Sequence, residues 1–349
     1  MKTNLADETL TLKSNVPLPA EMWGVTMLII IRDIGNLLKC KIGMVGAMRL
    51  AFGISAMAVN LVLQSVILWY VHKYIVDQAV HDTQVNYRQY HAEVFNVDGS
   101  FNATSWHFWT GPYMELCNLA VSKESFTFAI LFIWTARMLG EVRSIERLVR
   151  DINSINGNDG RSPMVEEFEN DDGIVEECHI TSLTVPARFA LYVFVVIPKL
   201  LIAAILMFIG CRWLCATESF SDLILNALAL EFVIGVDELI YDNFAPAAMK
   251  DWLEMTSMLH IKGSKHEKDS TVIMGYLRSM MYLGLCLGFA YAYIAYLQQV
   301  IPGFTHDIQE HCDGWFQKKY EPICPANGDT ETCFPYGPPV IGGGCPCAT

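Results

Sequence analysis

Four carboxylates interrupt one apolar stretch of the chain, residues 220–241, which is otherwise long enough to span a membrane. Glu231 lies near the middle of the stretch, and Asp222, Asp237 and Glu238 lie on either side of it. A charge at the centre of a bilayer costs roughly 2.5–3.5 kcal/mol on insertion scales, so a membrane helix keeps one only with a partner or a use. Such side chains can carry protons or bind cations.

Membrane helices are the elements that would have to hold these carboxylates. Of the 349 residues, 52% are hydrophobic and only 17% are charged, whereas soluble domains have roughly 25% charged residues. We therefore expect an all-α integral membrane protein. The net charge of −13 argues against nucleic acid as a partner, because nucleic-acid binding needs a basic surface that replaces counterions.

Five segments approach the roughly 20 apolar residues that a helical span needs. They are residues 46–71, 119–140, 187–211, 220–241 and 276–301, within a transmembrane domain of residues 46–301. The fourth is the most polar and could instead enter and leave the membrane on one side. Residues 23–31 are apolar but too short to span. Because basic residues follow them, we expect an interfacial helix within a cytoplasmic N-terminal segment, residues 1–45.

The distribution of basic residues predicts the orientation. Lysines and arginines concentrate in the N-terminal segment, after the second span and after the fourth span, and five spans place all three regions on one side. The positive-inside rule makes that side cytoplasmic, including the acidic loop 151–178. Loop 72–118 and a Cys/Pro/Gly-rich tail, residues 302–349, then face the lumen or the cell exterior. Asn102 begins a glycosylation sequon in that loop, as expected for a secretory-pathway or plasma membrane.

The tail is rich in cysteine. Disulfide bonds are expected there, because a short, loop-rich, Cys-dense segment rarely forms its own core. Metal binding is the alternative, but the spacing fits no common zinc pattern, and we expect neither a bound metal nor a cofactor. The candidate half-cystines are Cys312, Cys324, Cys333, Cys345 and Cys347.

The positions of polar residues along the predicted spans indicate a polar cluster inside the bundle. Asn60, Lys199 and Glu231 lie near the middles of the first, third and fourth spans, so they could meet at one level, with Pro198 bending its helix there. Asn60 shares a helix face with Arg49 and with small residues, which favours close helix packing. Two interpretations remain open: an ion pair that fixes helix register, or a path for protons or cations.

Two functional classes follow. The first is a cation or proton channel or transporter that uses the acidic fourth helix. The second is a non-catalytic structural or assembly subunit of a membrane complex, for which Gly284 and Gly288 offer a packing surface. Both imply a homo-oligomer or larger complex in the lipid bilayer. Enzyme motifs such as GxxxxGK[ST], HExxH and GxSxG are absent, so no catalytic residue is predicted. An intramembrane enzyme is the third and least favoured class, because Asp and Glu within spans can be catalytic. The transport-pathway candidates are Glu231, Asp237, Glu238, Asp222, Lys199, Asn60 and Arg49.

Overall fold

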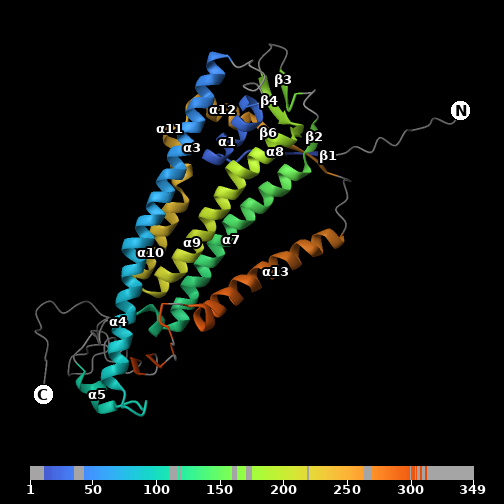
Figure 1. Ribbon diagram of the computed structural model, residues 1–349. Coiled ribbons are helices and arrows are strands. Elements are labelled where there is room, and N and C mark those ends of the chain that lie inside the picture. Colours follow the sequence, from blue (N-terminus) through green and yellow to red (C-terminus); the bar gives the residue numbers. More distant parts are fainter. Residues whose placement is uncertain are drawn as a thin grey trace, which may run out of the picture.

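The computed structural model is a bundle of long helices with a small β-sheet at one end (Figure 1). Four helices in the described part of the chain are long and apolar enough to cross a membrane, which confirms the predicted helical membrane class. The structure describes residues 12–34, 43–109, 116–117, 119–158, 163–169, 175–217, 220–262, 269–298, 300–302, 304, 307–308 and 311–312.

These four helices contain most of the predicted spans. The first is a continuous rod of α3 (Met44–Tyr70), a π-helical turn η2 (Val71–Val76) and α4 (Asp77–Val94). The second is α7 (Glu124–Ser154). The third is α8 (Val185–Leu191), a π-helical turn η4 (Tyr192–Val196) and α9 (Ile197–Cys215). The fourth is α13 (Asp269–Ala292), which ends in a π-helical turn η5 (Tyr293–Leu297).

The predicted fourth span is interrupted. Residues 220–244 form α10 (Phe220–Ile234) and α11 (Val236–Phe244), each shorter than a membrane crossing, and α12 (Ala247–Met255) follows. At Gly235 the backbone adopts ψ 6° instead of a helical value. Glycine weakens the helix at this point, and two acidic residues directly after it favour a new helix N-terminus. Both helices contact α3, so together they follow it along the bundle (Figure 1).

Helix α1 corrects the prediction of an interfacial helix. All residues of α1 (Met22–Ile29) are buried, and the helix packs against α3, α11 and α12. A helix that is apolar on every side has no face for water or lipid headgroups, so it belongs inside the protein. Gly53 of α3 permits the close approach, because a Cβ there would collide with Ile29. The following π-helical turn, η1 (Ile30–Ile34), is tied to α3 by a hydrogen bond of 2.7 Å from Arg49 Nε to Asp33 Oδ2.

The sheet joins segments that the sequence places on one side of the membrane. Its order is β1 (Leu12–Pro17), β6 (Thr256–Lys262), β4 (Val175–Ile180) and β3 (Val165–Glu169). β1 pairs with β6 antiparallel, β6 with β4 parallel and β4 with β3 antiparallel. β2 (Asn156–Asn158) and β5 (Ser182–Thr184) form a second, parallel pair. These strands add a β component to the predicted all-α fold, and they come from the N-terminal segment and the loops after the second and fourth predicted spans.

The opposite end of the bundle is covered by α4, α5 (Ala103–Phe108) and a short 3-10 helix η3 (Ala120–Ser122) (Figure 1). A disulfide bond between Cys117 and Cys312 joins the two regions predicted to share this side, with a Cα–Cα distance of 5.4 Å. Cys312 is therefore a half-cystine as predicted, but its partner lies outside the tail. Cys324, Cys333, Cys345 and Cys347 lie outside the described residues.

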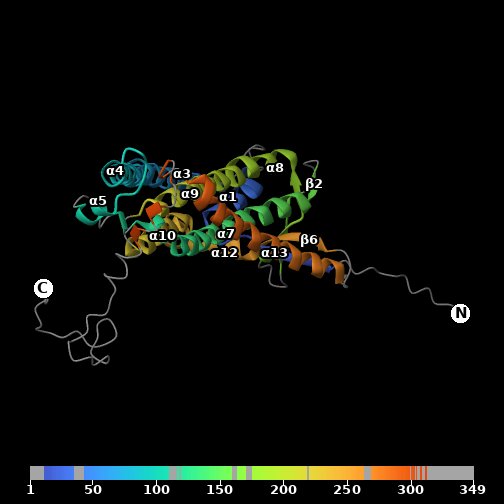
Figure 2. The ribbon, with the colours of Figure 1, turned by 90° about the horizontal axis from the view of Figure 1, so that it is seen from below.

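Helix α13 lies at the edge of the bundle, beside α7 (Figure 2). Large apolar side chains on most of its sides are exposed, whereas Cys286, Ala290 and, in the following turn η5, Tyr293 are buried. A Cβ added at Gly284 or Gly288 would meet no atom within 4 Å. The predicted small-residue surface is therefore not used within the described part of the chain.

Candidate functional site

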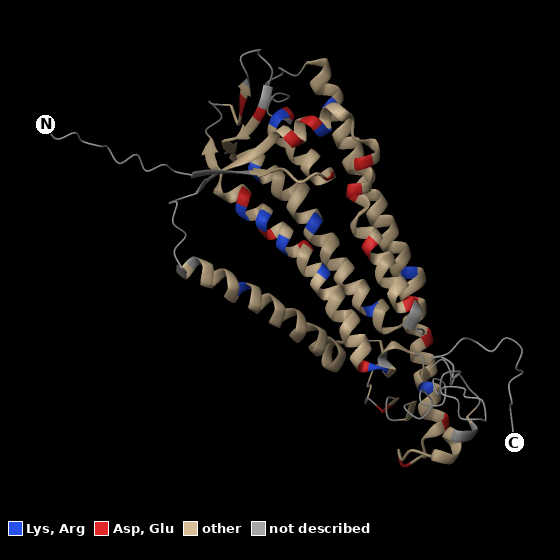
Figure 3. Cartoon of the chain, turned by 180° about the vertical axis from the view of Figure 1, so that it is seen from behind, with Lys and Arg blue, Asp and Glu red and all other residues tan. Residues whose placement is uncertain are grey.

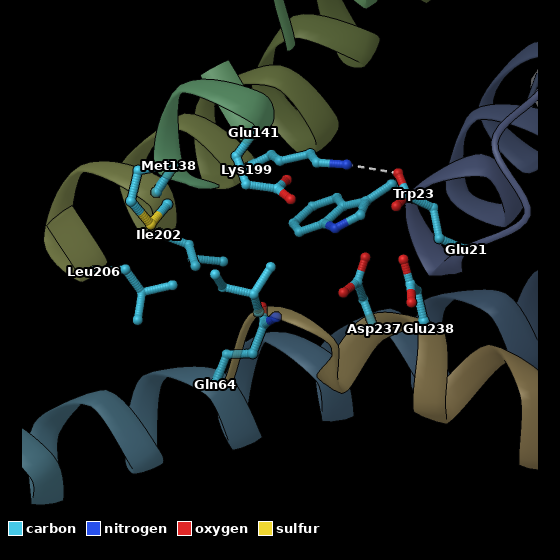
Figure 4. Close-up of a pocket in the computed structure, with 12 residues that line it drawn as sticks. Glu21, Trp23, Gln64, Met138, Glu141, Lys199, Ile202, Leu206, Asp237 and Glu238 are labelled. Carbon is cyan, nitrogen blue, oxygen red and sulfur yellow. Dashed lines mark hydrogen bonds and ion pairs between the residues drawn. The ribbon is translucent and has the colours of Figure 1, made fainter. Parts of the chain in front are cut away.

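A small cavity of about 40 Å³ lies between the helices of the bundle, where six of them meet: α1, α3, α7, α9, α10 and α11 (Figure 4). It has room for a few water molecules but not for an organic substrate. Its polar lining comes from the residue before α1, from α3, α7, α9 and α11. These side chains are Glu21, Gln64, Glu141, Lys199, Asp237 and Glu238, set among Trp23, Met138, Ile202 and Leu206. Charged positions also occur along the middle of the helices in Figure 3, not only at their ends.

An ion pair between Lys199 and Glu21 forms one wall of the cavity. Lys199 Nζ lies 2.6 Å from Glu21 Oε1, and the two side chains are only 11% and 15% exposed. Lys199 follows Pro198, and the wider π-helical turn η4, which ends at Val196, accommodates a residue that cannot donate a backbone hydrogen bond. Glu21 is the N-cap residue of α1, where the helix dipole favours a negative charge.

Asp237 and Glu238 bring two more carboxylates to the same cavity. Both lie in the first turn of α11, directly after the break at Gly235. The side chain of Asp237 is 5% exposed, and Glu21, Lys199 and Glu238 act on it electrostatically. Three carboxylates thus share one ammonium group. Glu238 is exposed, whereas Asp237 and Glu21 are largely buried. Because like charges repel more strongly where water is scarce, two buried carboxylates beside one ammonium group favour the binding of a proton, a cation or water.

Buried amide groups on α3 add to the polar interior. Gln64, 2% exposed, lines the cavity, and its Oε1 atom has no hydrogen-bond partner in the described structure. Asn60, one helical turn closer to the sheet, is fully buried, and neither of its amide atoms has a partner there. A buried polar atom without a partner costs about 1–3 kcal/mol, so such atoms normally contact water or an ion. The Gln64 Oε1 atom therefore gives the cavity one further acceptor for water or an ion.

Arg137 connects a second group of carboxylates to the cavity. Its Nε atom lies 2.7 and 2.8 Å from the two carboxylate oxygens of Glu231, and its Nη1 atom lies 2.6 Å from Glu141 Oε1. Glu141 lines the cavity, whereas Glu231 is half-exposed on the outer side of the network. A continuous set of charged groups therefore runs from Glu231 through Arg137 and Glu141 to the cavity.

The predicted cluster of Asn60, Lys199 and Glu231 is wrong in its pairing. Lys199 pairs with Glu21, and Glu231 pairs with Arg137. The physical reason is the rotation of each helix about its axis. The position of a residue along a span gives its level in the membrane but not the direction in which its side chain points.

The remaining candidates separate into two sets. Lys199, Asp237 and Glu238 line the cavity together. Asp222 is exposed in the first turn of α10, and Arg49 binds Asp33 near the sheet. Neither Asp222 nor Arg49 lines the cavity, and the ion pair that Arg49 makes holds η1 against α3.

Sequence reasoning missed Glu21, Arg137 and Glu141. Arg137 could have been found, because it lies inside the predicted span 119–140 and is as costly there as Glu231. Glu141 lies one residue beyond that span. Glu21 gave no signal, because only the burial of α1 carries it into the bundle.

Comparison of the chain with known proteins gives no homology to guide this assignment. No protein-family model matches it, and no curated protein or solved structure shows significant similarity.

The shared ammonium predicts an asymmetry between two single variants. Lys199→Met leaves three carboxylates facing one another, so we expect a loss of about 3–5 kcal/mol, as when one partner of a buried pair is removed. Glu21→Gln should cost less, because Lys199 still neutralises Asp237. Thermal unfolding of the purified protein in detergent measures the order, with exposed Lys73→Met as the control that removes an equal charge. An equal or reversed order would contradict the shared role of Lys199.

Proposed function

We propose that the chain conducts protons or small cations through the interior of its helical bundle. Glu21, Asp237 and Glu238 would take up the charge, and Lys199 would be the internal counter-charge. The observation that carries this proposal is the set of three carboxylates that share one ammonium group around a water-sized cavity.

The balance of charge supports it. The cavity and the Arg137 network together contain five carboxylates, Glu21, Glu141, Glu231, Asp237 and Glu238, but only two bases, Lys199 and Arg137. Glu238 is exposed and Glu231 is half-exposed, so three largely buried carboxylates face these two bases. Keeping the remaining buried carboxylate ionised is unfavourable unless a proton or cation binds there. The cavity volume restricts the species to protons, water and small ions.

The interrupted elements support it as well. Both α1 and α11 begin at the cavity, and their N-terminal ends bear Glu21 and Asp237. The N-terminal end of a helix is the positive end of its dipole, which stabilises the ionised carboxylates of Glu21 and Asp237 as acceptors for a proton or cation. The break at Gly235 gives α11 a point about which Asp237 could move relative to Lys199.

A structural or assembly subunit is the second candidate. The exposure of α13 on most sides and the open space beside Gly284 and Gly288 favour it, because both suit a partner helix. In this case the ion pairs would serve only to fix how the helices pack. A homo-oligomer or larger complex accompanies either function, as expected for so few helices.

We further propose five membrane crossings, with α10 and α11 as the interrupted fourth crossing, and a cytoplasmic sheet. Two observations support this. The sheet collects strands from the three basic regions, and the Cys117–Cys312 disulfide at the other end suits an oxidising compartment.

Proton and cation flux into liposomes tests conduction. We expect wild-type protein to carry protons or a monovalent cation under an imposed voltage, and Asp237→Asn to reduce the flux at least about tenfold, the effect of roughly 1.4 kcal/mol on a barrier. Exposed Asp222→Asn is the matched control and should leave the flux unchanged. Equal flux in wild type and Asp237→Asn would contradict the pathway. No flux in the wild type with any ion would favour the structural subunit.

Glycosylation tests the orientation. Asn102 Oδ1 accepts hydrogen bonds from the backbone N–H groups of Thr104 and Ser105, which caps α5, so a glycan on Nδ2 leaves this cap intact. In eukaryotic cells we expect a glycosidase-sensitive mass that Thr104→Ala abolishes. Lys262→Asn creates a matched sequon at the sheet end and should stay unmodified. Modification at position 262 with Asn102 unmodified would reverse the proposed orientation.

A further inference from the structure

A second cavity, of about 250 Å³, lies between α9 and the end of α13, away from the charged site. Its lining is mostly apolar, with Arg212 as its one charged residue beside the Tyr293 hydroxyl and the Cys211 thiol, and it extends along α9 from Ala204 to Arg212. On the α13 side it is bounded by Tyr293 and Leu297. The volume approaches the roughly 300 Å³ of the smallest ligand pockets.

Arg212 is only partly used by the protein. Its Nη1 atom lies 3.6 Å from Asp77 Oδ1, beyond hydrogen-bonding distance, and its Nε atom has no partner in the described structure. The guanidinium group also lies 5.4 Å from the ring of Phe208. A planar guanidinium with unused donors at the end of an apolar groove is suited to a phosphate oxygen.

The position of the groove along the bundle points to the bilayer. Exposed apolar side chains, including Leu201, Ile205 and Phe208, cover α9 up to Arg212. Exposed aromatic residues occur toward the same end of neighbouring helices, with Trp69 and Tyr70 on α3 and Tyr296 on η5. Aromatic side chains of this kind mark the boundary between hydrocarbon and headgroups, so the guanidinium lies at headgroup level and the groove extends into the hydrocarbon.

We infer that this groove binds an anionic phospholipid from the leaflet next to α5. One acyl chain would lie along α9 between Ala204 and Leu297, and the lipid phosphate would accept hydrogen bonds from Arg212. Asp77 competes with the phosphate for the same guanidinium group. The site does not depend on the proposed conduction, because it shares no lining residue with the charged cavity.

Lipid retention tests this site. The protein is reconstituted in vesicles of equal parts phosphatidylglycerol and phosphatidylcholine, extracted in detergent, and its retained lipid is measured by mass spectrometry. We expect about fivefold preference for phosphatidylglycerol, the contribution of one basic residue near anionic lipid. Arg212→Met should abolish the preference and Asp77→Asn should increase it. Arg88→Met, which removes an exposed base from α4, is the matched control and should behave as wild type.

Filling the groove provides an independent test. Ala204→Phe should reduce the retention of both lipids, and Leu297→Trp, at an exposed position on the rim, should do the same without disturbing the core. Undiminished retention in Leu297→Trp and Ala204→Phe would overturn the site. A phosphatidylglycerol preference that survives in Arg212→Met, or equal retention of both lipids by the wild type, would overturn the assignment of an anionic ligand.

Discussion

Neutralisation of charge inside an apolar bundle is the constraint on which this structure depends. Two ion pairs connect elements that are far apart in the chain: the largely buried pair of Glu21 and Lys199 ties the start of α1 to α9, and the half-exposed pair of Arg137 and Glu231 ties α7 to α10. Because removing one partner of the buried pair leaves a charge that neither water nor protein satisfies, this contact fixes which helices are neighbours. The burial of α1 follows, since its apolar surface and its N-cap carboxylate find partners only inside the bundle.

Charge is not fully neutralised at the cavity. Lys199 is paired with Glu21, yet Asp237 and Glu238 face the same cavity, and Gln64 Oε1 has no partner in the described structure. A site used only to hold helices together would gain nothing from a surplus of carboxylates and an unsatisfied amide. A site that binds and releases a proton or a small cation requires such a surplus. Only a carboxylate that no base has already neutralised can take up the proton or cation and give it up again.

Much of this fold could be predicted from local properties of the sequence. Features that depend on contacts between distant residues could not. Apolar length located α3, α7, α9 and α13, and the basic residues grouped the segments that form the sheet. The short strands were missed because β1 pairs with β6 across more than 200 residues and β4 with β6 across 78, so they carry little local signal. The level of Lys199 and Glu231 along their helices was predicted. Their partners depend on helix rotation and on α1, which its short apolar length and the basic residues after it had assigned to the membrane surface.

Access of water to the cavity tests the central claim most directly. Gln64→Cys, in a protein whose other unpaired cysteines are replaced, would be exposed to a membrane-impermeant thiol reagent applied to each side of sealed vesicles, with buried Leu68→Cys as the control. We predict that Gln64→Cys reacts, that Leu68→Cys does not, and that Asp237→Asn changes the rate at position 64. A cysteine at position 64 that stays unreactive from both sides would show a sealed, paired interior and would contradict conduction through this site.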